Sequence, residues 1–354
     1  MRVVVAGGGI VGLALARHLR ARGLDPVVLE RMPAGAHVAR GYMLGHQGYA
    51  SLEALGLLEG VRAAGWEIAP QPGGGSVAIG VEVGRVLALL ADGVPVRHRR
   101  AVTALTRDGD GRVTGVVADG PDGPEGHAAD LVVACDGLHS PVRAMAGITA
   151  VHEPLGSGML HFLSPVPPEV PFAMRELSGE GFVGVFGWPE GSAGFLSTLP
   201  VGAERALAPP LTEVRATFAR LLPPSATAVA GVTRRDQVRY YEPELMSCPA
   251  WWRPGVVVIG DAAHFFGPET GGSSGLGLGD AHALAEAVAA HPGDPDAACR
   301  EYVRWREPAV RPYEAVHPAR AGRRGTPLPA HTWPPPGETE GGPTAPGATP
   351  APAA

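Results

Sequence analysis

The sequence predicts an α/β protein with a discontinuous domain built on parallel strands, a second domain rich in β-sheet and a disordered C-terminal tail. Three short apolar runs are typical of buried parallel strands and lie far apart in the chain, at Arg2–Ala6, Asp130–Ala134 and Gly255–Ile259. Each run is followed by a loop that contains glycine. Between the second and third runs the chain is rich in strand-forming and turn-forming residues, which indicates a separate β-sheet.

The first of these runs opens a compact βαβ unit. The strand Arg2–Ala6 is followed by a helical pattern over Leu13–Arg22, which Gly23 ends, and by a second strand at Pro26–Glu30. This order of strand, helix and strand is the local context that a dinucleotide-binding motif requires.

The loop of this unit carries the motif GxGxxG. Gly7 permits a tight turn, Gly9 lets the backbone approach a pyrophosphate, and Gly12 lets the helix pack closely on the strand. The helix N-terminus then faces the phosphates, and an acidic side chain at the end of the second strand can accept from a ribose hydroxyl. A Rossmann-like domain is therefore predicted, with one bound dinucleotide, because the motif occurs once. The expected binding residues are Gly7, Gly9, Ile10, Val11, Gly12, Glu30 and Arg31.

The remaining elements follow from hydrophobic periodicity and turn residues. Helices are predicted at Tyr49–Leu55, Thr212–Leu222, Asp280–His291 and Asp296–Arg306, and strands at Ser76–Val83, Phe182–Trp188 and Phe195–Leu199. Asp280 is expected to cap the N-terminus of its helix. The run Arg85–Leu90 is interpreted as a strand in preference to a shortened helix.

Composition excludes several classes of function. The net charge is −6 and there is no dense basic patch, so nucleic acid is not expected as a partner. The chain has no lysine and no asparagine, which excludes Schiff-base chemistry and a lysine-containing phosphate loop. The three cysteines, Cys135, Cys248 and Cys299, form no disulfide framework, and no run is long enough for a membrane span, so a cytoplasmic protein is expected. No metal site is predicted, because no ligand spacing is present.

Two further motifs follow the second and third apolar runs. CDGLHSPVR occupies Cys135–Arg143, and GDAAHFFGPETGG begins at Gly260. Together with GGGIVG at Gly7–Gly12, and in this order, they resemble the three fingerprints of the single-component (group A) flavoprotein aromatic hydroxylases, the para-hydroxybenzoate hydroxylase-like family. The resemblance extends from Met1 to about Arg320.

This resemblance implies an enzyme that binds FAD, takes electrons from transiently docked NADPH or NADH, and uses O2. Such an FAD monooxygenase would insert one oxygen atom into an aromatic or polycyclic small molecule through a flavin hydroperoxide. The flavin carries the chemistry, so no catalytic side chain is assigned. The further cofactor-binding residues that the resemblance implies are Arg40, Asp136, Gly137, Arg143, Gly260, Asp261, Pro268, Gly271, Gly272 and Ser273.

The resemblance also implies the domain organisation. The FAD-binding domain is expected to comprise residues 1–65, 94–150 and 246–317. The substrate domain is expected to comprise 66–93 and 151–245, and 318–354 form a Pro/Ala-rich disordered tail. A monomer or a homodimer is expected.

Two departures from the family pattern leave alternatives open. First, the side-chain amides that the family often has after Pro268 are missing. Second, the segment between Gly65 and Val94 is shorter than usual in the family, and Arg85 therefore stays undecided as a cofactor contact. The alternatives are a related reductase or oxidase that inserts no oxygen, and a non-catalytic relative that binds FAD weakly. A flavin-dependent halogenase is rejected, because its active-site lysine is absent.

Several side chains have both a structural and a functional interpretation. His264 is expected to cap or pack near the cofactor, Arg175 to be a solvated charge, and Ser140 to be a turn hydroxyl. Six aromatic residues of the β-rich domain either form ordinary core or line an aromatic substrate pocket. They are Phe162, Phe172, Phe182, Trp188, Tyr240 and Tyr241.

Overall fold

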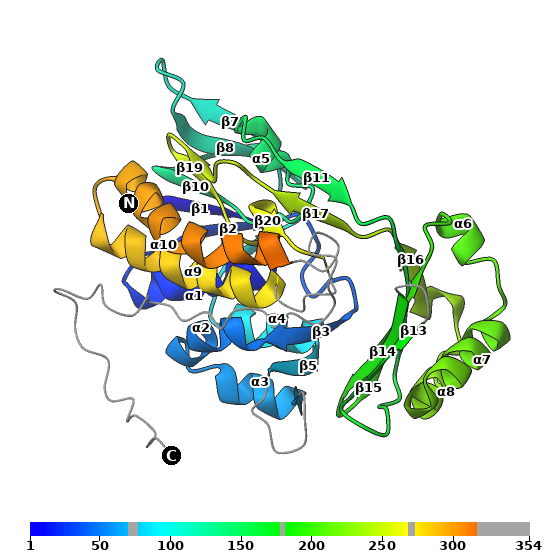
Figure 1. Cartoon of the computed structure of the whole chain (residues 1–354). Helices are drawn as coiled ribbons and strands as arrows, with labels where there is room; N and C mark the ends of the chain where they lie inside the picture. The colour runs from blue at the N-terminus through cyan, green and yellow to red at the C-terminus, as the bar shows by residue number, and fades with distance from the viewer. Residues whose placement is uncertain (70–76, 178–180, 268–272, 317–354) are drawn as a thin grey trace.

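The central feature of the computed structural model is a six-stranded sheet in the order β18-β19-β10-β1-β2-β6 (Figure 1). The structure describes residues 1–69, 77–177, 181–267 and 273–316, with side chains described up to Tyr313. The strands are β1 (Val3–Ala6), β2 (Val27–Glu30), β6 (Val96–His98), β10 (Leu131–Ala134), β18 (Trp252–Arg253) and β19 (Val256–Val258). All neighbours pair in parallel except β18 and β19. The three apolar runs thus form the adjacent strands β1, β10 and β19, as predicted.

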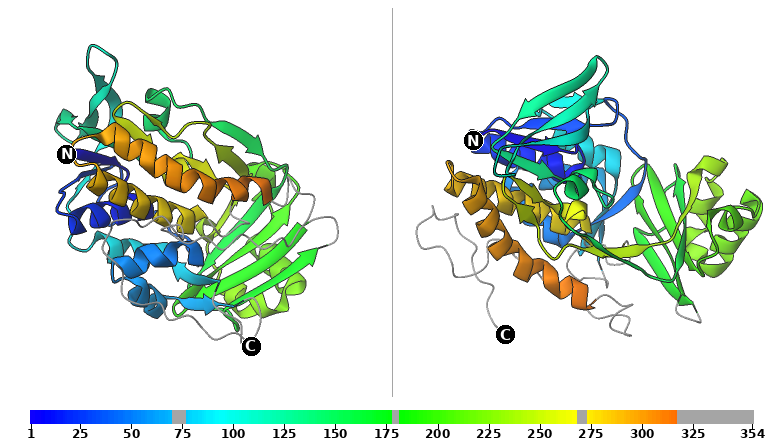
Figure 2. Two further views of the ribbon diagram at one scale, coloured as in Figure 1. Left: turned by 60° about the vertical axis from the view of Figure 1, so that its left-hand side comes forward. Right: turned by 90° about the horizontal axis from the view of Figure 1, so that it is seen from above.

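The two faces of this sheet are covered differently. Helices α1 (Ile10–Ala21), α9 (Ser273–Ala290) and α10 (Pro295–Val316) lie on one face (Figures 1 and 2). A three-stranded antiparallel sheet packs on β10 from the other side, made of β7 (Ala101–Arg107), β8 (Val113–Gly120) and β9 (Gly123–Ala128). Because both faces are covered, the central strands are buried and consist almost entirely of Val, Leu and Ala.

Beside the central sheet lies a second small unit. It pairs β3 (Gly41–Gly45), β5 (Ala78–Glu82) and β4 (Trp66–Ile68), and carries α2 (Tyr49–Ala54), α3 (Leu58–Ala64) and α4 (Val83–Ala91). The short turn η1 (His46–Gly48) precedes α2. The assignment of residues 66–93 to the substrate domain remains a prediction. In the structure, β4, β5 and α4 of segment 66–93 contact β3, α1 and α3.

The prediction of a strand at Arg85–Leu90 is wrong, because these residues lie in α4. The carboxylate of Glu82 caps the helix by accepting from the backbone N–H of Arg85 at 3.2 Å. Val83, Val86 and Leu90 are buried, and this spacing of three and four residues is helical. The run of Leu and Ala around them consists of good helix formers.

The β-rich part of the chain forms a five-stranded antiparallel sheet in the order β13-β14-β15-β12-β16. Its strands are β12 (Gly158–Ser164), β13 (Phe172–Leu177), β14 (Gly181–Trp188), β15 (Gly191–Thr198) and β16 (Val238–Tyr241). Helices α6 (Ala203–Ala206), α7 (Leu211–Leu221) and α8 (Ala226–Ala230) lie on its outer side (Figure 2). The turn η2 (Pro223–Ser225) connects α7 to α8, and η3 (Arg235–Gln237) lies between α8 and β16. The opposite face is turned toward the central sheet (Figures 1 and 2).

A third small sheet connects the two halves of the molecule. It pairs β11 (Val151–Pro154), β17 (Glu244–Ser247) and β20 (His264–Phe265). In chain order β11 precedes β12 and β17 follows β16, so these two strands connect the five-stranded sheet to the rest of the protein (Figure 1). Helix α5 (Pro141–Met145) precedes β11, and η4 (Gly260–Ala262) precedes β20. None of the described helices is both long and apolar enough to cross a membrane.

Candidate functional site

The GxGxxG loop is shaped by close backbone contacts. Gly7 has φ +115°, and a Cβ there would lie 2.5 Å from the carbonyl oxygen of Cys135 in the second fingerprint. A Cβ at Gly12 would lie 2.0 Å from the carbonyl oxygen of Gly7. A Cβ at Gly9 would meet no atom within 4 Å. Gly7 and Gly12 therefore serve the packing of the loop, whereas the space in front of Gly9 is open.

Helix α1 begins in this open space. Its N-cap is Gly9, and no side chain in the described part of the protein caps the helix. The first N–H groups of a helix have no partner inside the helix and carry the positive end of its dipole. An exposed, uncapped N-terminus after a parallel strand fits a pyrophosphate.

Glu30 lies at the end of β2, beside the loop. One carboxylate oxygen accepts from the backbone N–H of Gly8 and the other from that of Met32, both at 2.7 Å. A carboxylate has about four acceptor sites, so Glu30 can hold these two segments and still accept from a sugar hydroxyl. Its neighbour Arg31 is exposed.

The second fingerprint is held together by its own side chains. The carboxylate of Asp136 accepts from the hydroxyl of Ser140 and, at 3.1 Å, from the backbone N–H of Val142. Ser140 in turn caps α5 by accepting from the backbone N–H of Arg143 at 2.9 Å. Burial raises the pKa of Asp136, although these hydrogen bonds oppose the shift. Ser140 is thus a helix cap, and Gly137, with φ +95°, forms the turn before it.

Arg143 links the second fingerprint to the third. It is buried, and one guanidinium nitrogen donates to the carbonyl oxygen of Ala262 at 3.0 Å. The loop of Gly260 and Asp261 is thereby fixed relative to α5. In this structure Arg143 positions the cofactor loops, and a direct contact with the dinucleotide stays a prediction.

Asp261 lies at the carboxyl end of β19, next to Arg40. Burial raises the pKa of Asp261, whereas the charges of His264 and Arg40 lower it. The guanidinium of Arg40 lies 5.9 Å from the ring centroid of Tyr42. The charges of Arg40 and Asp261, which are far apart in sequence, therefore act on each other. Gly260 has φ +58°, and this backbone turn presents Asp261.

The end of the third fingerprint lies outside the described residues. Pro268, Gly271 and Gly272 lie outside the described residues. Ser273 opens α9, and its hydroxyl oxygen is buried without a hydrogen-bond partner among the residues described. A contact between Ser273 and the cofactor stays a prediction.

A buried polar cluster supports the third fingerprint, and sequence reasoning missed it. Asp280 was expected to cap a helix, which is wrong: α9 begins seven residues earlier, and Asp280 lies inside it, 0% exposed. One carboxylate oxygen accepts from Arg306 Nε at 2.8 Å, and the other accepts from the N–H of Gly260 at 2.9 Å and lies 2.6 Å from His264 Nε2. Burial alone would raise the pKa of Asp280, but His264 and Arg306 hold it well below its usual range.

The inner face of the five-stranded sheet is aromatic. Five of the six predicted aromatic residues divide between the two faces of the sheet, and the sixth, Tyr241, is 39% exposed. Phe162 and Tyr240 pack in the outer cluster with α7 and α8. Trp188 lies on the inner face with Phe186 and packs against Gly41 of β3. Phe172 belongs to the same inner cluster, and Phe182 makes an edge contact with Phe195 at 5.7 Å between ring centroids.

Beyond this aromatic cluster the inner face becomes polar. His161 on β12 lies between Phe195 of β15 and Arg239 of β16 in the strand register. Burial, with smaller contributions from the charges of Arg239 and Arg40, lowers the pKa of His161 to about 4. His161 is therefore neutral at pH 7. Arg175, by contrast, donates to the carbonyl oxygen of Leu221 at 3.2 Å on the outer side of the sheet.

The fold and these loops define a dinucleotide-binding oxidoreductase scaffold with a second, aromatic-lined domain. Residues 76–312 match the family described as "FAD binding domain", and residues 2–69 match "FAD dependent oxidoreductase". The chain belongs to the FAD binding domain family. Among curated proteins, it is 28% identical to 3-amino-4-hydroxybenzoate 2-monooxygenase of Streptomyces cremeus, over 87% of this chain and 84% of the relative.

Other comparisons agree. The chain is 27% identical to 2-heptyl-3-hydroxy-4(1H)-quinolone synthase of Pseudomonas aeruginosa, over 80% of each chain. The crystal structure of 2-methyl-3-hydroxypyridine-5-carboxylic acid oxygenase has the same fold, with a TM-score of 0.74 at 21% identity over 91% of each chain. The protein is an FAD-dependent monooxygenase.

Proposed function

We propose that this monooxygenase takes its electrons from NADH or NADPH and hydroxylates an aromatic small molecule that carries an anionic group. The observation that carries the proposal is the inner face of the five-stranded sheet. There the half-buried rings of Phe182 and Phe195 adjoin neutral His161 and the cation of Arg239. An apolar aromatic wall beside one cation and one hydrogen-bonding imidazole suits an aromatic carboxylate or phenolate.

Bound FAD would supply the hydride acceptance and oxygen activation that amino-acid side chains lack. We propose that the N-terminus of α1 binds its pyrophosphate, with Gly9 giving the close approach, and that Glu30 accepts from a ribose hydroxyl. Asp261, together with Arg40, would bind the ribityl side of the cofactor. The same assignment covers Arg31, Asp136, Gly137 and Gly260 as loop contacts, and Pro268, Gly271, Gly272 and Ser273 beside the flavin ring.

The chain's own contribution to the reaction would be positioning and the exclusion of water. The aromatic wall would hold the substrate ring and keep water from the reacting centre. Arg239 would fix the orientation of the ring through its anionic group, and His161 would donate or accept one hydrogen bond, since it is neutral. No side chain is assigned as an acid or base.

The test begins with the visible absorption spectrum of the purified protein, without oxygen and then with it. We expect a flavin spectrum that bleaches on addition of NADPH or NADH and returns when air is admitted. Aromatic acids are then screened under 18O2, and one labelled oxygen atom per product is expected. A product without the label would refute hydroxylation and indicate a flavin reaction that inserts no oxygen. A colourless protein that cannot be reconstituted with FAD would refute the enzyme assignment.

Arg239→Gln tests the substrate class. We expect KM for an anionic aromatic substrate to rise by about 10–100-fold, because a charge-assisted hydrogen bond is lost, whereas FAD affinity stays unchanged. Arg175→Gln is the matched control on the other side of the same sheet, and its KM should equal that of the unmodified protein. Equal KM values for both variants would refute the anionic subsite.

Size-exclusion chromatography with light scattering decides between the proposed monomer and homodimer.

A further inference from the structure

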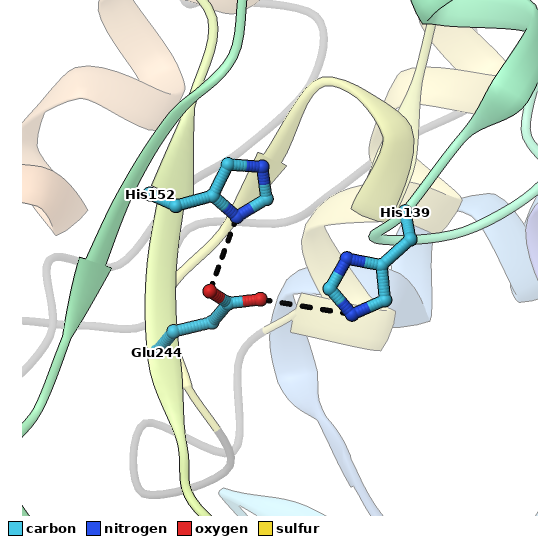
Figure 3. Close-up of side chains that lie close together, drawn as sticks. All are labelled: His139, His152 and Glu244. Carbon is cyan, nitrogen blue, oxygen red and sulfur yellow. Dashed lines mark hydrogen bonds and ion pairs between the residues drawn. The ribbon is translucent and has the colours of Figure 1, made fainter.

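Three potential metal ligands, of which Glu244 is distant in sequence from His139 and His152, meet at the junction between the two halves of the molecule (Figure 3). His139 comes from the loop of the second fingerprint, His152 from β11 and Glu244 from β17. His152 Nδ1 lies 3.1 Å from one carboxylate oxygen of Glu244, and His139 Nε2 lies 3.7 Å from the other. The ligand atoms of all three residues lie within 4.8 Å of one another.

The local fold explains how two of the ligands come together. β11 and β17 are antiparallel, with His152 opposite Met246 and Pro154 opposite Glu244. His152 and Glu244 are therefore diagonal neighbours on one face of the strand pair, at the separation where long side chains meet. The rings of His139 and His152 stack with centroids 5.9 Å apart, so both imidazoles border the same carboxylate.

The spacing is close to that of a zinc coordination sphere. With bonds of about 2.0–2.1 Å and tetrahedral angles, neighbouring ligand atoms lie roughly 3.3 Å apart. The two histidine–carboxylate distances, 3.7 and 3.1 Å, lie on either side of this value. These distances go to the two different oxygens of Glu244, and the two imidazole nitrogens lie within 4.8 Å of each other, so a modest rearrangement of the side chains would close the site around one ion. The side chain of His139 is 77% exposed and can therefore adjust at little cost in packing.

We infer that His139, His152 and Glu244 form a binding site for a divalent transition-metal ion, with Zn²⁺ the ion that the donor set fits best. Two neutral imidazoles and one carboxylate favour Zn²⁺ and its neighbours over Mg²⁺ and Ca²⁺, which take oxygen ligands. Three protein ligands leave a fourth position to water. The carboxylate neutralises part of the ionic charge in a place that is only partly shielded from solvent.

A bound ion would connect three parts of the molecule. The loop of His139 belongs to the cofactor site, whereas β11 and β17 are the two strands that run to the five-stranded sheet (Figure 1). Zn²⁺ at this junction would tie the second fingerprint to these connecting strands and restrain their relative movement. The inference is independent of the reaction proposed above, and no chemical step is assigned to the ion.

The test is calorimetric titration of the FAD-loaded full-length protein with ZnCl2, alongside His139→Ala and His152→Ala. We expect one site with micromolar or tighter Kd in the unmodified protein. Each variant should weaken binding by more than the ~10–100-fold that loss of an outer-shell partner causes. His291→Ala is the matched control. His291 pairs with Glu301 at side-chain exposures of 34% and 23%, almost equal to the 33% and 22% of His152 and Glu244. Among the described residues, the pair of His291 and Glu301 has no second imidazole that would complete a group of three metal ligands. Its Zn²⁺ affinity should be unchanged.

Two further measurements keep the test decisive. Co²⁺ in place of Zn²⁺ should give the intense visible bands of a tetrahedral site in the unmodified protein and lose them in His152→Gln, whose FAD content reports that the fold is intact. MgCl2 should give no binding heat. The inference is wrong if Zn²⁺ binds only at millimolar concentration, or if binding persists in the protein that lacks both His139 and His152 side chains.

Discussion

The substitution Asp280→Asn should destabilise the protein strongly, although it changes almost no volume. Asp280 is fully buried, and its two oxygens serve Arg306, Gly260 and His264. The amide of Asn has one acceptor oxygen and two N–H donors, so it cannot accept from the three donors that surround the carboxylate. It also leaves the guanidinium of Arg306, which is 2% exposed, without a counter-charge.

The expected size follows from this geometry. Removing one member of a buried ion pair costs about 3–5 kcal/mol. At the roughly 2 °C per kcal/mol that holds for large domains, the melting temperature of the variant should fall by about 6–10 °C. Because the N–H of Gly260 loses its acceptor next to Asp261, the affinity for FAD should also fall, by about tenfold for each 1.4 kcal/mol of binding free energy lost.

The assay is thermal unfolding followed by circular dichroism, together with FAD titration followed by flavin fluorescence. Asp25→Asn is the control. Asp25 pairs with Arg20 at the surface, where its side chain is 82% exposed, and such pairs contribute about 1 kcal/mol or less. A melting temperature within about 2 °C of the unmodified protein, with unchanged FAD affinity, would refute the assignment of Asp280 as the anchor of the third fingerprint.

Three other substitutions test separate parts of the site. Gly9→Val should leave the melting temperature of the apoprotein unchanged and abolish FAD binding. Gly12→Val should prevent folding, because of these two positions only Gly12 would place a Cβ in a clash inside the protein. FAD titration measures the first effect, and the yield of soluble protein measures the second. Arg143→Met should cost about 1–3 kcal/mol in urea unfolding, since the buried carbonyl of Ala262 then keeps only the weak thiol donor of Cys248. The pKa of His161 is about 4 in the folded protein and ~6.5 in the unfolded chain. The contribution of neutral His161 to the free energy of unfolding is therefore complete above about pH 6.5 and is lost as the pH falls toward 4. Urea unfolding of His161→Gln should show a weaker loss over this window, and an equal loss would contradict the assignment.

Much of the nucleotide-binding half could be predicted because its signals are local. A short run of β-branched residues predicts a buried strand, and the three runs indeed form β1, β10 and β19. Arg85–Leu90 was misjudged because a short apolar run suits either a strand or a helix. The deciding evidence lay just outside the run, in the capping carboxylate of Glu82 and the helical spacing that begins at Val83.

The orientation of the substrate domain was harder to predict. Alternation along β12 and β16 separates Phe162 from His161 and Tyr240 from Arg239, but a sequence does not state which face of a sheet meets the cofactor. The packing of α7 and α8 on the face of Phe162 decides it. His161 was overlooked because a lone histidine in a strand has no local signature, and its altered pKa arises from burial and from arginines on other elements.

The third fingerprint shows how tertiary packing overrides local propensity. The glycine-rich segment before Asp280 was expected to be a loop, since glycine costs about 1 kcal/mol in a helix. In the structure it is the first half of α9, because the glycines let this helix approach other backbones. A Cβ at Gly277 would lie 2.6 Å from Val11, and one at Gly275 would lie 3.0 Å from the carbonyl oxygen of Gly45.

Asp280 is the residue that makes this close approach useful. It follows the last of these glycines and reaches the backbone of Gly260, so the helix that packs on the first fingerprint also holds the third. The glycines and the aspartate therefore act together: the glycines set the distance between α9 and the cofactor loops, and the carboxylate fixes the position of the loop that presents Asp261. Neither role is visible in the sequence, because each depends on a partner more than ten residues away.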